Sequence, residues 1–215
     1  MKNLLVKEFR LAMHQTVIMF WCLSSMLLIP SYPYYVVLFY TGLGIFFVCL
    51  TGRENHDIEY SLSLPARKRD IVTARFAFAV IVEGVQLALC VPFAMLRATF
   101  PLPGNEVGMD ANIAFFGLGL LMLGIFNYLF FTGYYKAPDK VGKVFAVSSV
   151  LVFVYIAVVE VLAHAVPFMR DVLDTPDPQH LTPKLITLAI GAASYALLTY
   201  LAWRRSVVSF QKLDL

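Results

Sequence analysis

The sequence predicts an all-α membrane protein with six transmembrane helices, and three observations indicate this class. Of the 215 residues, 60% are hydrophobic and 14% are charged, whereas soluble domains carry about 25% charged residues. The apolar residues are concentrated in runs of roughly 20 residues, the length that a helix needs to cross a bilayer. The charged residues lie mostly between these runs. Together these observations exclude an ordinary soluble domain.

The expected spans occupy most of the chain, so we expect a single transmembrane domain over residues 1–215 with no separate nucleotide-binding domain. Pro30 and Pro33 leave only a short turn after the first run. The first two runs are therefore either two full spans, which their lengths favour, or a helical hairpin that does not fully cross. The expected spans are the runs at about 14–30, 34–51, 76–98, 112–135, 144–166 and 184–203.

The basic residues predict the orientation of the chain in the membrane. Fourteen of the 17 Lys and Arg residues fall in the two terminal segments and in the loops after the second and fourth spans. The other three, Arg97, Arg170 and Lys184, fall in the remaining loops. Because loops rich in Lys and Arg stay inside, both termini are expected to be cytoplasmic.

The segment 4–11 is amphipathic and precedes the first apolar run. Its three leucines share one helical face, and Lys7, Glu8 and Arg10 are expected to turn toward water. This pattern predicts an N-terminal helix that lies in the inner membrane interface. The alternative is a simple cytoplasmic extension of the first span.

The most informative segment lies between the second and third spans, where Leu64 and Pro65 precede the basic triplet 67–69. A Lys or Arg at the membrane centre costs roughly 2.5–3.5 kcal/mol on insertion scales, so this segment stays in the cytoplasm. Pro65 breaks it into two pieces, and Tyr60, Leu62 and Leu64 offer apolar contacts to a soluble partner. The alternative is a basic loop that only fixes the topology or touches anionic lipid.

Signatures of catalysis are missing from the sequence. It has no G-x-x-x-x-G-K-[ST] phosphate loop and no H-E-x-x-H zinc motif. We therefore expect no catalytic residues, no metal ion and no cofactor in this chain. Glu160 and His164 are four residues apart on one helix, but two ligands without a third are a weak metal signal, and a paired polar contact in the outer part of the bundle is the alternative.

Ionisable and polar side chains inside the spans are candidates for the translocation path. Glu83 lies eight residues after Arg75, hence about 12 Å into the third span. An acidic side chain at that depth either serves function or contacts a neighbouring helix or subunit as a hydrogen-bonded carboxyl group. The candidate path residues are Glu83, Asn127 and Glu160.

Three parts of the sequence resemble one known family. They are the segment from Glu54 to Arg75, the C-terminal segment 209–215 with its aromatic, basic and Asp-Leu residues, and the Lys-Glu-bearing segment 5–11. Together they resemble ABC-2 type transporter permeases, specifically the small bacterial six-span transmembrane subunits of ABC exporters. The order of the spans, two before the coupling region and four after it, is also similar to that of the family.

The resemblance implies a cytoplasmic coupling helix between spans 2 and 3 that fits a groove on a separate ABC ATPase. ATP and Mg would then be bound by that partner, and two permeases would pair as a homo- or heterodimer in the bacterial cell (inner) membrane. It also suggests short re-entrant helices within the outer segment 167–183. The residues expected to couple to the ATPase are Asp57, Glu59, Tyr60, Leu62, Leu64, Pro65, Arg67, Lys68 and Arg69.

The resulting functional prediction is an ATP-driven exporter of an amphipathic or hydrophobic substrate, such as a peptide, a lipid-like molecule or a drug. An ion- or proton-coupled secondary transporter with Glu83 and Glu160 as relay groups is the alternative. It would be expected to carry internal repeats, which the sequence does not show. An intramembrane hydrolase is a third possibility, and the missing motifs argue against it.

Overall fold

The computed structural model describes residues 2–100 and 104–213, and every regular element in those ranges is a helix. The predicted all-α fold is therefore confirmed. In chain order the elements are α1 (Lys2–Lys7), η1 (Glu8–Ala12), α2 (Gln15–Cys22), η2 (Leu23–Leu28), α3 (Tyr34–Glu54), α4 (Asp57–Ser63), α5 (Lys68–Thr99), α6 (Ile113–Tyr134), η3 (Pro138–Lys140), α7 (Val141–Ala165), η4 (Met169–Leu173) and α8 (Leu181–Gln211).

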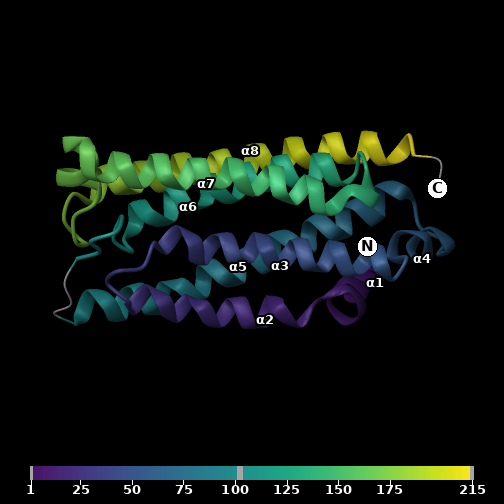
Figure 1. Ribbon diagram of the computed structural model, residues 1–215, viewed down its shortest axis with the longest axis horizontal. Helices are drawn as coiled ribbons and strands as arrows, with labels where there is room; N and C mark the ends of the chain where they lie inside the picture. Colours follow the sequence, from purple (N-terminus) through teal and green to yellow (C-terminus); the bar gives the residue numbers. More distant parts are fainter. Residues whose placement is uncertain (1, 101–103, 214–215) are drawn as a thin grey trace.

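The long helices lie lengthwise in one bundle, with α6, α7 and α8 on one side and α2 on the other (Figure 1). The segment α1, the short helix α4 and the C-terminal end of α8 gather at the same end of the bundle, which we call the α4 end. Arg53 at this end donates a hydrogen bond of 3.2 Å to the carbonyl oxygen of Asp139 in η3. The four segments rich in Lys and Arg thus share one end of the molecule, as the positive-inside pattern requires. We call the opposite end the far end.

Among the residues that the structure describes, five helices are long and apolar enough to cross a membrane, and a sixth is counted if the bent N-terminal pair forms one span. In that pair the segment Lys2–Ala12 meets the segment Gln15–Leu28 at 80°. The first predicted run therefore appears as α2 and η2, and it ends before Pro30 and Pro33. An angle of 80° suits a first segment that lies along the membrane interface while the second enters it.

One detail of the N-terminal prediction is wrong. Lys7 and Glu8, which were expected to contact water, are only 8% and 2% exposed, whereas Leu11 on the expected apolar face is 69% exposed. The physical reason is that both charged side chains have charged partners inside the bundle. A buried charge is tolerated when it is paired and hydrogen-bonded.

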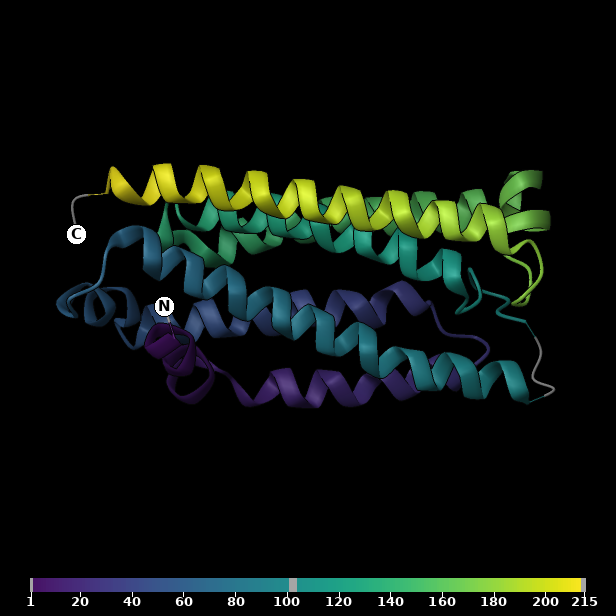
Figure 2. The ribbon, with the colours of Figure 1, turned by 180° about the vertical axis from the view of Figure 1, so that it is seen from behind.

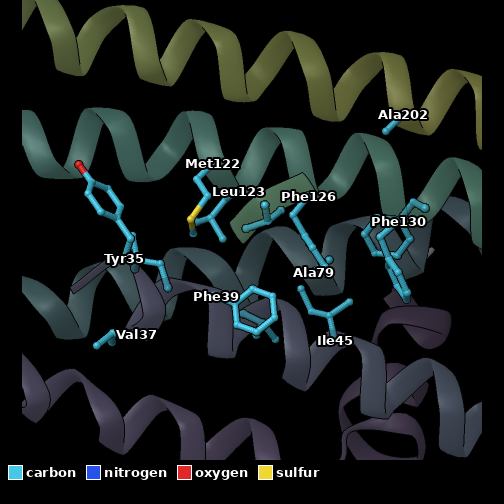
Figure 3. Close-up of a cluster of buried hydrophobic side chains, with 14 of the residues drawn as sticks. Tyr35, Val37, Phe39, Ile45, Ala79, Met122, Leu123, Phe126, Phe130 and Ala202 are labelled. Atoms are coloured by element: carbon cyan, nitrogen blue, oxygen red, sulfur yellow. The ribbon is translucent and has the colours of Figure 1, made fainter. Parts of the chain in front are cut away.

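The core between α3 and α6 combines aliphatic and aromatic side chains. Figure 3 shows Phe39 of α3 and, on α6, Phe126 and Phe130 among the buried side chains. The rings of Phe126 and Phe130 stack with centroids 5.2 Å apart. A Cβ atom on Gly42 would lie 3.0 Å from Phe126 Cζ, so the glycine leaves room for that ring. Large rings against small residues fix how α3 and α6 pack.

Helix α5 crosses the bundle at a slant (Figure 2). Near its start, Thr73 accepts a hydrogen bond of 3.0 Å from Trp203 of α8. Farther along, Gln86 donates a hydrogen bond of 2.9 Å to Ser24 of η2. The helix therefore contacts α8 at the α4 end and the N-terminal span toward the far end, and it connects the two sides of the bundle.

Candidate functional site

A cluster of four charged side chains, three of them buried, joins four elements at the α4 end. Arg75 of α5 places its Nε atom 2.6 Å from Glu8 Oε2 of η1 and its Nη2 atom 2.5 Å from Asp57 Oδ2 of α4. Lys7 of α1 pairs with the same Asp57 carboxylate and donates a hydrogen bond of 2.9 Å to Ser61 Oγ. The coupling-helix candidate α4 is thus bound to both the N-terminal segment and α5.

The four charges of this cluster, which we call the α4 charge cluster, sum to zero. Arg75 is only 4% exposed and Glu8 only 2%. Each cation contacts both anions of the cluster, so no member is left as an isolated charge inside the protein. Removing one partner of such a buried pair costs about 3–5 kcal/mol, because the other charge stays buried without compensation. A displacement of α4 therefore pulls on η1 and α5 together.

The outer face of α4 and of the following turn presents several of the predicted coupling residues to solvent. Glu59, Tyr60, Pro65 and Arg67 are exposed. The Tyr60 ring is 52% exposed, and the Arg67 side chain, which pairs with Asp70 at 3.0 Å, is 85% exposed. These residues form a surface that a soluble partner can reach.

The remaining predicted coupling residues contact the chain itself. Lys68 donates a hydrogen bond of 2.5 Å to the carbonyl oxygen of Leu213, and the Arg69 guanidinium lies 5.1 Å from the centre of the Trp203 ring. Both contacts join the start of α5 to the C-terminal part of the chain. Asp57 belongs to the α4 charge cluster, while Leu62 and Leu64 are half-buried.

Two of the three candidate path residues meet in the middle of the bundle. Asn127 of α6 donates a hydrogen bond of 3.0 Å to Glu83 Oε2 of α5. The Tyr195 hydroxyl of α8 donates a hydrogen bond of 2.5 Å to the same oxygen. Asn127 also donates a hydrogen bond of 3.2 Å to the Thr199 hydroxyl oxygen of α8. Sequence reasoning missed Tyr195 and Thr199, although polar groups four residues apart on a span are a usable signal. The polar contacts thus join three helices.

Glu160 lies elsewhere, in the far half of α7, where its Oε2 atom accepts a hydrogen bond of 2.9 Å from the backbone nitrogen of Met109. It forms no chain of hydrogen bonds with Glu83 among the described residues, which argues against a relay between the two. Over residues 2–100 and 104–213, no group of three His, Cys, Asp or Glu residues is placed to hold a metal ion.

The far end is closed by polar contacts between its loops. The backbone nitrogen of Asp110 donates a hydrogen bond of 2.7 Å to Asp174, and Asn112 donates one of 2.7 Å to the carbonyl oxygen of Leu173. Burial raises the pKa of the Asp174 carboxyl group to about 6. Part of the segment 167–183 forms the short helix η4, whose Leu173 is buried. The loop before α6 and the loop before α8 therefore form one structured cap.

We expect Glu83→Leu to lower the free energy of unfolding by about 1–3 kcal/mol, because Asn127 and Tyr195 would each lose a buried hydrogen-bond partner. Glu83→Gln keeps an oxygen acceptor of the same size, so its stability should stay close to that of the wild type. Thermal unfolding in detergent measures both effects, with Val80→Leu at an exposed position of α5 as the control. A Glu83→Leu variant as stable as the wild type would contradict a structural role for this contact.

Comparison with known proteins relates nearly the whole chain to one protein family. Residues 3–211 match the family model described as ABC-2 family transporter protein, which covers nearly the entire chain. No curated protein and no solved structure gave a match. The family match confirms the predicted resemblance to ABC-2 type permeases; it covers the segments 5–11 and 54–75 and ends at residue 211, within the C-terminal segment.

Proposed function

Because the chain belongs to the ABC-2 family of transporter proteins and is a multi-pass permease subunit, we propose that it exports its substrate using a separate ABC ATPase. ATP and Mg²⁺ bind to that ATPase in this proposal, and this chain performs no hydrolysis. Its own part is to convert the movement of the ATPase into a movement of the spans. It works as a homo- or heterodimer of permeases in the bacterial inner membrane, with both termini and α4 in the cytoplasm.

The α4 charge cluster is the observation that carries this proposal. A short helix at the basic end of the bundle presents an exposed face, and its opposite side is fixed to η1 and α5 by buried ion pairs. A force applied to α4 by a docked ATPase would therefore reach a long helix that crosses the bundle. A loop that only fixed the topology would gain nothing from buried charges that cost several kcal/mol to desolvate.

The chemistry of the spans supports an amphipathic or hydrophobic substrate. The long helices present exposed apolar side chains, among them Val150 and Val161 of α7 and Ile190 of α8. These faces suit contact with lipid, with the second permease or with an apolar part of the substrate. Basic segments gathered at the α4 end support its cytoplasmic placement and hence transport driven from inside.

The double change Tyr60→Asp with Arg67→Glu is expected to weaken binding of the ABC ATPase about tenfold, a loss of about 1.4 kcal/mol. The reason is that an exposed aromatic anchor and an exposed cation would both become negative at the docking surface. The measurement is co-purification in mild detergent followed by titration of the purified ATPase.

Lys140→Glu is the matched control, since Lys140 is an exposed cation at the same end but on η3. It should leave ATPase binding within about twofold of the wild type. Undiminished binding by the Tyr60 and Arg67 double variant would return the segment to the role of a topology anchor. ATP hydrolysis by the purified chain alone would exclude the proposed division of labour.

A further inference from the structure

The slant of α5 leaves a cleft between its second half and helices α6 and α8. The cleft has a volume of about 740 Å³. Most of its wall is apolar, including Leu87 and Val91 of α5, Phe116 and Leu120 of α6 and Leu188 of α8. A volume between about 300 and 1,000 Å³ with a mostly apolar lining and a few polar groups is typical of small-molecule sites.

The polar lining of the cleft lies at one end, toward the cap. It consists of Arg97, Asp110, Asn112 and Asp177, which come from the end of α5 and from the two far-end loops. The polar lining is therefore confined to one end of the cleft along the length of the bundle, while the rest of the wall is apolar. An amphiphile in a bilayer has the same arrangement, with its polar group at the interface and its apolar body in hydrocarbon.

The rim contains two ion pairs in which the cation is the more deeply buried partner. Arg97 lies 3.1 Å from Asp110, with side chains 8% and 29% exposed. Lys184 lies 2.8 Å from Asp177, with side chains 0% and 31% exposed. Both carboxylates also line the cleft. The carboxylate is thus the more accessible member of each pair, although Arg97 also lines the cleft and the pairs together are neutral.

We propose that this cleft binds a drug-sized amphiphile that carries one ammonium group. The apolar body lies against the walls formed by α5 and α6, and the ammonium group lies at the rim beside Asp110 and Asp177. An ammonium group can contact the exposed carboxylates directly, whereas an anionic head group would have to reach cations that are more deeply buried and already paired. An uncharged head group would gain no ionic contact. This inference concerns binding to the permease and requires neither ATP nor an ATPase.

The test uses the purified full chain in phosphatidylcholine nanodiscs with no ATPase present. Three photoreactive probes share a dodecyl chain bearing a diazirine and differ only in the head group: ammonium, hydroxyl or sulfate. Cross-linked peptides are mapped, and the yield on residues 87–100 and 113–120 is divided by the yield on α7. This ratio corrects for unequal partitioning of the probes into the bilayer.

The ammonium probe is expected to exceed the other two in this ratio about fivefold, which corresponds to about 1 kcal/mol. Ala88→Trp fills the cleft from an exposed position that lines it and should lower the ratio about fivefold. Leu89→Trp is the matched control, because Leu89 is the next residue on α5, is also exposed and does not line the cleft. Equal ratios for the three probes would overturn the proposal, and so would an unchanged ratio in a folded Ala88→Trp variant.

Discussion

Replacing Arg75 by methionine is expected to lower the free energy of unfolding by about 3–5 kcal/mol and to abolish ATP-driven transport. Methionine retains most of the length of the side chain but leaves the carboxylates of Glu8 and Asp57 buried without their shared guanidinium. Lys7 alone would then face two negative charges. Chemical unfolding in detergent measures the stability, and reconstitution with the ATPase measures transport.

Two further variants make this prediction specific. Arg53→Met removes an arginine at the same end whose side chain is 39% exposed, and it should cost less than about 1 kcal/mol. Combining Arg75→Met with Glu8→Gln leaves one cation and one anion, Lys7 and Asp57, so part of the lost stability should return. A double-mutant cycle between Arg75 and Glu8 that gives no coupling energy would refute the α4 charge cluster as a stabilising unit.

The sequence predicted the bounds of the helices well where hydropathy alone determines where a helix begins and ends. The runs 34–51 and 112–135 correspond closely to α3 and α6. The runs 76–98 and 184–203 are shorter than α5 and α8, which begin at Lys68 and Leu181 and end at Thr99 and Gln211. A hydropathy pattern detects the part of a helix that fits the hydrocarbon, whereas the hydrogen-bonded helix continues through polar residues on both sides.

The site was predicted less completely, because its contacts join residues that are distant in sequence. Glu8, Asp57 and Arg75 lie on three different elements, and no local sequence pattern predicts that their side chains form ion pairs. A rule that charges near apolar segments turn to water therefore failed for Lys7 and Glu8. The slant of α5, which separates its second half from α8 and opens the cleft, is likewise a result of packing. The available signal was that opposite charges flank the same end of several spans.

Adding a side chain at Gly191 is expected to be the most damaging change to the packing of α6 against α8. A Cβ atom on Gly191 would overlap the carbonyl group of Gly117, and one on Gly117 would lie 2.6 Å from the carbonyl oxygen of Thr187. The two backbones touch directly, so no flexible side chain can move aside. Gly191→Val should therefore cost about 3 kcal/mol or more, at or above the upper end of ordinary overpacking.

Gly84→Ala on α5 is the control, because a Cβ atom there meets no neighbour within 4 Å. At an open helical position, alanine in place of glycine should leave the stability unchanged or raise it by about 0.5–1 kcal/mol. Gly191→Val and Gly84→Ala should therefore shift the unfolding midpoint in opposite directions or by very different amounts. Separation of α6 from α8 would also move Tyr195 away from Glu83, because Tyr195 lies one turn after Gly191 on the same helix. A Gly191→Val variant with wild-type stability would mean that α6 and α8 do not pack backbone to backbone.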